Sequence, residues 1–235
     1  MILSQRTPRI NRVAIYDDDP TNRESLADVL SDAGFDPTPI DHPASDLNDC
    51  VTMLMQFDAS LMDHRVKAGG YGNFDGAAVV QRLYAQKRPS VLVTAWARGD
   101  WEELQPYRRQ LVDVISKEDA DDIRICEAFD RCLKEYIGNY PPDRRPTKTI
   151  VRIAETYDPG NGHHRVRAFV PAWDPQEGVT FPIDIVPNTL REYLKEDIRL
   201  LAEVNTGALS QEELFFENFS LAKEPSGELA KLLRS

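Results

Sequence analysis

Short apolar runs alternate with amphipathic stretches over the first 137 residues of the chain. Five runs have the length and the β-branched or aromatic content of buried strands, at residues 13–16, 38–40, 59–62, 90–93 and 111–115. The stretches between them carry apolar residues at helical spacing, near residues 20–33, 47–55, 77–83, 101–109 and 122–137. Strands that alternate with helices in this way predict an α/β fold, a doubly wound five-stranded parallel sheet.

The pattern changes to a period of two after residue 149. Residues 138–148 are rich in proline and charge, so they predict a linker. Beyond it the expected strands are 150–156, 166–170, 179–185 and 198–204, with a hairpin turn at 158–162, a capping-box helix at 189–192, and a stretch at 214–221 that is ambiguous between strand and helical turn. We therefore expect a small β-rich domain at 149–224, a barrel or a sandwich, followed by a tail at 225–235.

Composition narrows the function classes. The chain has 235 residues, 41% of them hydrophobic, and a formal net charge of −11, which argues against nucleic acid as the main partner. No apolar run has the length of a membrane span, and the first nine residues lack an apolar signal core. Cys50, Cys126 and Cys132 have no metal-type spacing and are most simply small core residues. We expect a cytoplasmic protein.

Four of the five expected strands end in side chains that suit phosphate chemistry. Asp17 and Asp18 follow the first strand, while Asp63, Thr94 and Lys117 follow the third, fourth and fifth. Because the carboxyl ends of parallel strands meet at one edge of the sheet, these side chains should lie together. Carboxylate oxygens suit Mg²⁺, and a hydroxyl and an ammonium suit phosphoryl oxygens. Asp63 would then be the nucleophile that forms an acyl phosphate.

The helix that follows the acidic residues has a start and a stop of its own. Asp19 precedes Pro20, so Asp19 is expected to cap the helix while Asp17 and Asp18 belong to the site. Gly34 supplies the left-handed stop at the other end.

In their order and separation these segments resemble the receiver domain of two-component response regulators. The matching segments are VAIYDDDP at 13–20, LMD at 61–63, VLVTA at 91–95 and DVISK at 113–117, and the resemblance covers roughly residues 11–137. The resemblance implies that Asp63 accepts a phosphoryl group from a histidine kinase or phosphotransfer protein in a phosphorelay, and that Thr94 and Lys117 bind that group. It also implies Mg²⁺ as cofactor, held by Asp17, Asp18, Asp63 and the backbone carbonyl of Arg65.

A receiver is a signalling module, so the resemblance predicts no enzyme. The β-rich domain resembles no family, and we expect it to signal through a downstream protein partner, with a homodimer as a further option.

The chain departs from the receiver pattern around the acceptor. Val66 and Lys67 stand where Met-Pro is common, and Asp75-Gly76 arrives about five residues late, as loops tolerate insertions. Val114 replaces the usual aromatic residue of the fifth strand, and Glu118 replaces the usual proline. The usual coupling of Thr94 to an aromatic residue is therefore not expected. The glycine-rich loop at 64–73 and Trp96 are alternative switching elements.

Two other interpretations stay open. A receiver fold can serve as a phosphate sink, or as an interaction scaffold without phosphorylation. A haloacid-dehalogenase-like phosphatase that depends on Mg²⁺ would use Asp17 and Asp19 as its D-x-D pair, but it also needs an acidic pair after a later strand. Asp121 and Asp122 sit at a helix start instead, and Asp63 would have no role.

Overall fold

The structure is a computed structural model that describes residues 10–67, 69–95, 101–160 and 162–222. The chain divides into two compact units, Met1–Pro141 and Pro142–Ser235. Each unit has its own buried core. None of the helices within the described ranges has both the length and the apolar character needed to cross a membrane.

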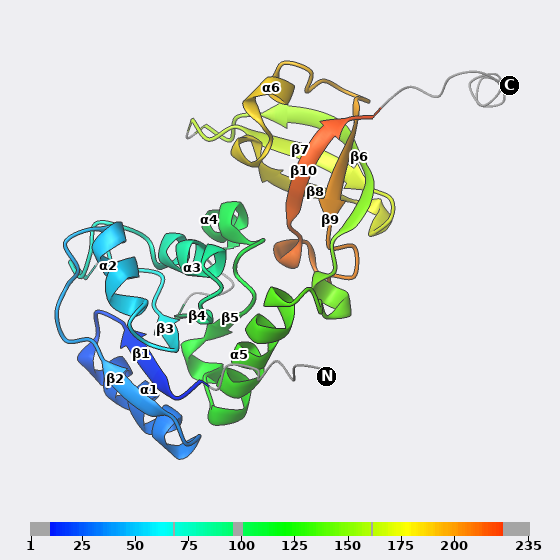
Figure 1. Cartoon of the computed structure of the whole chain (residues 1–235). Helices are drawn as coiled ribbons and strands as arrows, with labels where there is room; N and C mark the ends of the chain where they lie inside the picture. Colours follow the sequence, from blue (N-terminus) through cyan, green and yellow to red (C-terminus); the bar gives the residue numbers. More distant parts are fainter. Residues whose placement is uncertain (1–9, 68, 96–100, 161, 223–235) are drawn as a thin grey trace, which may run out of the picture. The chain divides into compact units, whose positions relative to one another are not determined.

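The first unit is built on a five-stranded parallel sheet (Figure 1). Its strands are β1 (Arg12–Tyr16), β2 (Asp36–Pro39), β3 (Ala59–Met62), β4 (Ser90–Thr94) and β5 (Val114–Ser116). Their order across the sheet is β2-β1-β3-β4-β5, and all four neighbouring pairs are parallel. The predicted α/β fold with five parallel strands is confirmed. β5 begins three residues later than expected, because only residues 114–116 pair with β4.

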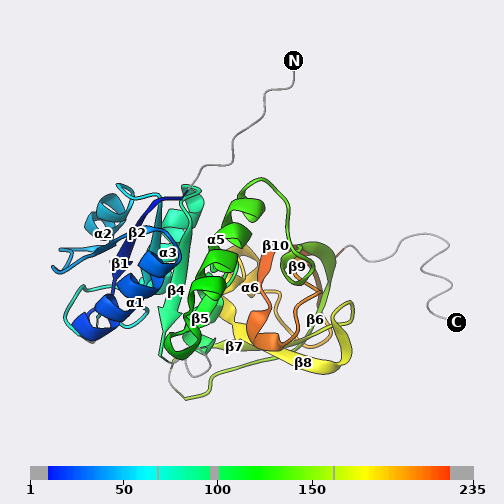
Figure 2. The same ribbon diagram turned by 90° about the horizontal axis from the view of Figure 1, so that it is seen from below.

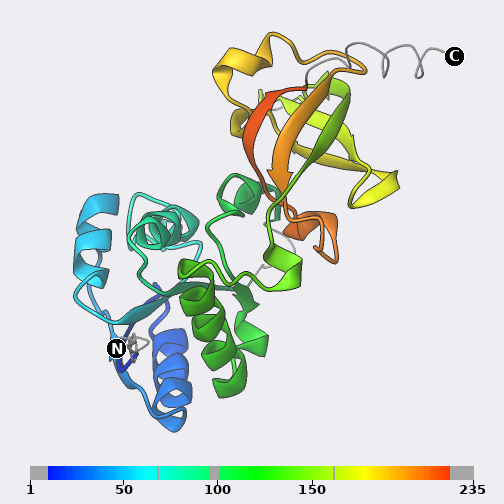
Figure 3. The ribbon, with the colours of Figure 1, turned by 45° about the vertical axis from the view of Figure 1, so that its right-hand side comes forward.

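Helices cover both faces of this sheet. They are α1 (Pro20–Asp32), α2 (Leu47–Leu54), α3 (Gly76–Ala85), α4 (Trp101–Leu104) and α5 (Asp122–Tyr136), with 3-10 turns η1 (Gln105–Tyr107) and η2 (Lys117–Asp119). Figure 3 shows α1 and α5 on one face and α2 and α3 on the other. Successive side chains of β1 point to opposite faces of the sheet and so contact both layers of helices. Val13 and Ile15 pack with α1 and α5, while Ala14 and Tyr16 pack with α2 and α3.

The ends of α1 are as the sequence predicts. Asp19 is the N-cap, and its side chain accepts a hydrogen bond of 2.8 Å from the backbone N–H of Thr21. Pro20 occupies the first helical position, and Gly34 has a φ of 84° just after the helix. The expected helix at 101–109 is shorter than predicted, since α4 ends at Leu104 and continues only as η1, where Pro106 has no N–H to continue an α-helix.

Helix α5 buries one side and leaves apolar residues exposed on another. Ile125, Phe129 and Cys132 are buried, with Tyr136 partly buried beside them. Cys126 is exposed, so the expectation of three core cysteines is wrong for this one. Residues one position further along the helix point about 100° away, because an α-helix has 3.6 residues per turn. The apolar residues of this helix therefore lie on two sides of it.

The second unit is a five-stranded antiparallel sheet (Figure 2). Its elements are η3 (Pro142–Arg144), β6 (Thr147–Tyr157), β7 (Arg165–Val170), β8 (Asp174–Pro182), η4 (Ile183–Ile185), α6 (Asn188–Arg191), β9 (Arg199–Val204), η5 (Gln211–Glu213) and β10 (Phe216–Leu221). The strand order is β10-β9-β6-β7-β8, which leaves β10 and β8 at the two edges. The rings of Phe181 on β8 and Phe216 on β10 nevertheless lie 4.5 Å apart. The sheet is therefore curled so that side chains of its two edge strands pack together.

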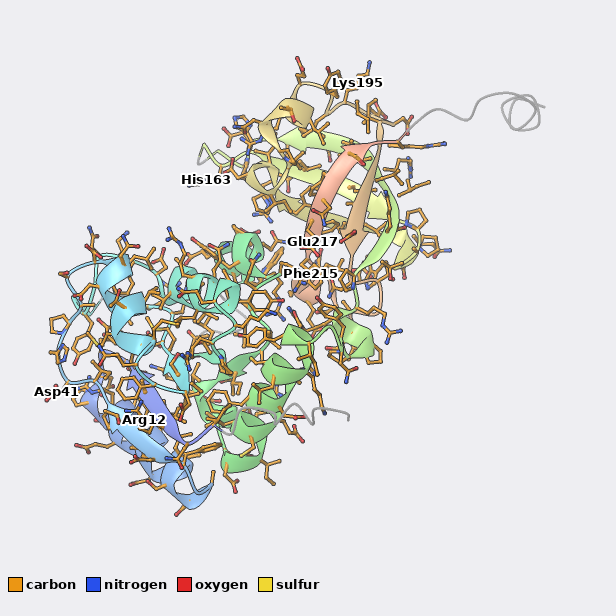
Figure 4. The ribbon with its side chains drawn as sticks, in the orientation of Figure 1. Arg12, Asp41, His163, Lys195, Phe215 and Glu217 are labelled. Atoms are coloured by element: carbon orange, nitrogen blue, oxygen red, sulfur yellow. The ribbon has the colours of Figure 1, made fainter. Side chains whose placement is uncertain are left out.

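Several local expectations for this unit are refined by the structure. The β6–β7 hairpin forms as predicted, and the ambiguous stretch at 214–221 is largely the strand β10. The capping-box prediction is wrong, because α6 follows Pro187 and no side chain caps it. Figure 4 shows His163 in the hairpin connection and Lys195 between α6 and β9, both at the periphery of the unit.

A buried asparagine joins three segments of the second unit. The side-chain Nδ2 of Asn205 donates to the carbonyls of Asp143 (2.9 Å) and Glu213 (3.0 Å). Its Oδ1 accepts a hydrogen bond of 2.7 Å from the backbone N–H of Phe215, a residue labelled in Figure 4. Asn205 is 1% exposed, and it connects the start of the unit to the β9–β10 connection.

Candidate functional site

Two buried carboxylates lie side by side at the carboxyl edge of the parallel sheet. β1 and β3 are neighbours in register, with Tyr16 opposite Met62, and the N–H of Asp63 donates to the carbonyl of Tyr16 at 2.9 Å. Asp17 and Asp63 therefore follow adjacent strand ends. Asp17 is 1% exposed and Asp63 is 5% exposed. Two ionised carboxylates at this depth repel each other unless a cation compensates them.

Lys117 supplies such a cation. It follows β5 directly, and its Nζ lies 2.6 Å from Oδ2 of Asp17 and 2.9 Å from Oδ1 of Asp63. Burial raises the pKa of the Asp63 carboxyl above its ordinary value, and the neighbouring Lys117 works in the opposite direction. Burial favours the neutral amine of Lys117, but hydrogen bonds to Asp17 and Asp63 raise its pKa overall. The three groups form a set of two buried carboxylates and one partly exposed ammonium.

Backbone N–H groups satisfy the other oxygen of each carboxylate. The N–H of Asp19 donates to Oδ1 of Asp17 at 2.9 Å, and the N–H of Arg65 donates to Oδ2 of Asp63 at 2.7 Å. Thr94 is buried at the end of β4, opposite Ser116 of β5. The structure thus brings Asp17, Asp63 and Lys117 into direct contact, and the roles of Thr94 and of the Arg65 carbonyl stay predictions.

Asp18 lies against the glycine-rich loop. It is half-buried, and its side chain lies directly against the backbone of Gly69. A Cβ at position 69 would come 1.6 Å from Oδ2 of Asp18, so only glycine allows this approach. At Gly69 the glycine-rich loop therefore packs directly against Asp18.

Side-chain contacts hold this loop at Tyr71. The backbone carbonyl of Tyr71 accepts a hydrogen bond of 2.6 Å from the hydroxyl of Tyr16. The hydroxyl of Tyr71 donates to the carbonyl of Ile40 at 3.0 Å. The guanidinium of Arg23 lies 5.2 Å from the centre of the Tyr71 ring and donates to the carbonyl of Asp17 at 2.7 Å. The loop is thus linked to β1, to the segment after β2 and to α1. Trp96, the other expected switching residue, lies outside the described residues.

Sequence reasoning missed several residues around the acceptor. His64 directly follows Asp63 and is 2% exposed, and its Nε2 lies 3.6 Å from Oε2 of Glu103. Gly76 lies directly against the backbone of Asp63, and a Cβ at position 76 would come 1.8 Å from the carbonyl oxygen of Asp63. Both residues could have been singled out because they lie in the loop that follows the acceptor. The contacts of Tyr16 and Arg23 with this loop could not, because these residues are far from the loop in the sequence.

The donor chemistry at this edge fits Mg²⁺. Hard divalent cations take carboxylate and carbonyl oxygens, and Asp17, Asp18, Asp63 and the Arg65 carbonyl are of that kind. Asp17 and Asp63 together carry one more negative charge than Lys117 compensates. Among the described residues, no group of three His, Cys, Asp or Glu side chains is already arranged as a metal centre. Binding would therefore require the carboxylates to shift from their contacts with Lys117 and Gly69.

Comparisons with known proteins find a likeness to solved receiver structures over part of the chain. No family model matches the chain, and no curated protein matches it. A CheY-like receiver domain protein from Methanospirillum hungatei is 15% identical, with 55% of this chain and 98% of that chain covered and a TM-score of 0.42. The receiver domain of NtrX from Brucella abortus is 20% identical over 52% of this chain and 98% of that chain, with a TM-score of 0.40.

Three further solved structures match the chain. The receiver domain of NarL from Mycobacterium tuberculosis is 23% identical over 54% of this chain and 98% of that chain, with a TM-score of 0.39. Longer NtrX structures from Brucella abortus are matched over only 28% and 27% of their chains.

The first unit has the doubly wound, flavodoxin-like fold. Its strand order, 2-1-3-4-5 with helices on both faces, is the flavodoxin-like order in which CheY is also built. The acidic residues lie where that order predicts a site, outside the carboxyl ends of the strands.

Proposed function

We propose that the protein is a response regulator of a phosphorelay that accepts a phosphoryl group on Asp63. The observation that carries the proposal is the contact of Lys117 with both Asp17 and Asp63 at the carboxyl edge of the sheet. This arrangement keeps one buried carboxylate next to a fixed positive charge that a transferred phosphoryl group would need. A histidine kinase or a phosphotransfer protein is the donor.

In the proposed transfer, a carboxylate oxygen of Asp63 attacks the phosphorus of a phosphohistidine. The new P–O bond forms as the P–N bond breaks, and the imidazole of the donor leaves with its bonding electron pair. Lys117 would compensate the charge of the phosphoryl oxygens, and the hydroxyl of Thr94 would donate to one of them. Mg²⁺, held by Asp17, Asp18, Asp63 and the Arg65 carbonyl, would supply further charge neutralisation when bound.

For the output, we propose protein–protein contacts of the second unit. The net charge of −11 disfavours a nucleic-acid target, because phosphate binding depends on clustered Lys and Arg. The free cysteines Cys50, Cys126 and Cys132 are compatible with a reducing cytoplasm.

The phosphatase alternative is disfavoured by the position of its required acids. Asp121 caps α5, with Oδ1 accepting a hydrogen bond of 2.7 Å from the N–H of Arg124. Asp122 lies in the first turn of the same helix, so neither residue follows a strand. Asp63, which that chemistry does not use, is in contact with Lys117.

Phosphorylation with a small phosphodonor tests the proposed acceptor. Incubation of the full chain with acetyl phosphate and Mg²⁺ should add the mass of one phosphoryl group, and chelation of Mg²⁺ should prevent it. Asp63→Asn should abolish the gain, whereas Asp58→Asn, which changes a carboxylate at the opposite end of β3, should retain it. A gain that persists in Asp63→Asn, or its absence from the wild type, would refute the assignment.

Partner binding separates an output protein from a phosphate sink. A partner other than the kinase that binds the wild type after phosphorylation, and does not bind Asp63→Asn, supports the output. Binding by the kinase alone would favour the sink, and a partner bound equally with and without phosphorylation would favour a scaffold.

A further inference from the structure

The outward side of the antiparallel sheet carries a cluster of arginine side chains. Strand β7 buries every second residue in the core of the second unit, while Arg167 and Phe169 point to the other side. Arg152 of β6 lies opposite Phe169 of β7 and also opposite Arg199 of β9. Residues directly opposite each other in an antiparallel sheet share a face, so these four side chains lie together. We call Arg152, Arg167, Phe169 and Arg199 the arginine face.

The stability of the sheet does not account for this cluster. Arg152 and Arg199 are like charges on directly opposite positions, which destabilises a sheet. Asp197 lies 3.1 Å from Nη1 of Arg152 and Glu155 lies 3.6 Å from Nη1 of Arg167, but both pairs are exposed and such pairs contribute little. In the described ranges no acidic residue pairs with Arg199. A local rule broken without a structural gain is expected at functional sites.

Phe169 and Gly178 hold two of the guanidinium groups in place. Cζ of Arg152 lies 4.7 Å from the centre of the Phe169 ring, which is a cation–π contact. Gly178 of β8 lies opposite Phe169, and a Cβ at position 178 would come 3.3 Å from Nε of Arg167 and 3.8 Å from the Phe169 ring. Glycine at this position therefore leaves the space in which Arg167 and Phe169 lie. The result is an aromatic ring beside two guanidinium groups whose side chains are 40% and 54% exposed.

We propose that the arginine face binds an acidic segment of a protein partner, one that carries carboxylates beside aromatic or aliphatic side chains. The guanidinium groups of Arg152 and Arg167 donate to the carboxylates of the partner, since their planar forks match carboxylate geometry. The ring of Phe169 packs against an apolar side chain of the same segment. The inference rests on the proposed output of the second unit through a protein partner, and it does not depend on phosphoryl transfer to Asp63.

The surroundings of the arginine face favour a protein over a nucleic acid. Ile150, which is 43% exposed, and the partly buried Leu201 lie opposite each other on β6 and β9 and continue the same side of the sheet. Arginine together with aromatic residues is typical of protein interfaces. Residues 142–235 contain 15 Asp and Glu against 12 Lys and Arg, so a long phosphate backbone would meet repulsion outside the face. A short acidic segment need contact only the face itself.

Fluorescence anisotropy of a labelled random copolymer of glutamate and tyrosine tests the face on the full chain. Binding should saturate and should weaken as the ionic strength rises, because salt screens exposed charges. Arg152→Gln combined with Arg167→Gln should weaken binding about tenfold, since each removes a charged donor. Arg145→Gln is the control, because Arg145 is exposed and precedes β6, about 20 Å along the chain from Arg152. A wild type that does not bind, or an equal loss in Arg145→Gln, would overturn the proposal.

Gly178→Val tests the face without a change of charge. The φ of Gly178 is not in the left-handed region, and valine suits a strand, so circular dichroism should be unchanged. The new side chain would displace Arg167 and Phe169 from the space above position 178. Binding of the copolymer should therefore weaken several-fold. A variant that binds as tightly as the wild type would place the copolymer elsewhere on the surface and contradict the proposal.

Two other polyanions and one further variant separate the proposal from its alternatives. Polyglutamate, which has no apolar side chain, should bind more weakly than the copolymer, and equal binding would contradict the role of Phe169. An oligothymidylate of the same charge that binds more tightly than the copolymer would show a nucleic-acid site and overturn the proposal. Asp63→Asn should bind the copolymer as the wild type does, so a failure of phosphoryl transfer and a failure of the arginine face give different results. Loss of binding in Asp63→Asn would contradict a site confined to the second unit.

Discussion

Lys117 is one positive charge between two buried carboxylates, so its removal affects more than one ion pair. Its Nζ contacts Asp17 at 2.6 Å and Asp63 at 2.9 Å. Without it, two like charges would remain buried side by side, and both desolvation and mutual repulsion would oppose folding. The residues that make the site are therefore also residues on which the stability of the first unit depends.

Lys117→Met should lower the free energy of unfolding by about 3 kcal/mol at pH 7, since loss of one partner strands a buried charge. Asp63→Asn added to Lys117→Met should restore part of that loss, because only one of the two carboxylates then stays ionised. Urea denaturation of the two single variants and the double variant gives the coupling energy. Strictly additive effects would mean that the two side chains do not interact in the folded protein.

At the scale of elements, the starts of two neighbouring strands are tied together at the edge of the sheet opposite the site. Oδ2 of Asp58, just before β3, accepts hydrogen bonds from the backbone N–H groups of Asn11 (3.1 Å) and Arg12 (2.8 Å) at the start of β1. Arg12 is labelled in Figure 4. These bonds, first of all that from Arg12, hold the pKa of the Asp58 carboxyl below its ordinary value of 3.8.

A lowered pKa in the folded state makes the contribution of Asp58 depend on pH. The folded protein favours the ionised carboxylate, so its stabilisation is present above the unfolded value of 3.8 and is lost as the pH falls through the folded pKa. Asp58→Ala should therefore cost about 1 kcal/mol at pH 7 and less as the pH falls below 4. Urea titrations of wild type and variant from pH 7 to pH 3 measure the difference. A difference that stays constant over this range would contradict the role of the ionised form.

The elements that the sequence predicts well are those whose signals are local. The strand ends at Asp17, Asp63 and Lys117 follow from apolar runs that stop at polar residues, and Asp19 and Gly34 bound α1 through their own backbone preferences. What could not be predicted depends on contacts between distant segments.

Tyr71 and α5 show why long-range contacts limit such predictions. The hydrogen bond between Tyr71 and Tyr16 joins residues 55 positions apart. The sequence of the glycine-rich loop alone therefore does not predict that Tyr71 is bonded to β1. The apolar residues of α5 repeat on two sides of the helix, and periodicity alone does not tell which side meets the sheet.

At the scale of the whole molecule, the chain contains separate cores. The two faces of the parallel sheet and the curled antiparallel sheet each bury their own set of apolar side chains. Every pairing of strands stays within one of the two sheets, among the residues that the structure describes. Two units of this kind have independent sources of stability.

Asn205→Ala should therefore destabilise the second unit alone. Asn205 is 1% exposed, and its side chain satisfies the carbonyls of Asp143 and Glu213 and the N–H of Phe215. The variant leaves these backbone groups without that partner in a buried place, which should cost about 2–3 kcal/mol. In calorimetry of the full chain, one thermal transition should move down by several degrees. The transition that Lys117→Met lowers should be the other one, and it should not move in Asn205→Ala. A single transition that both variants shift equally would mean that the two units unfold as one.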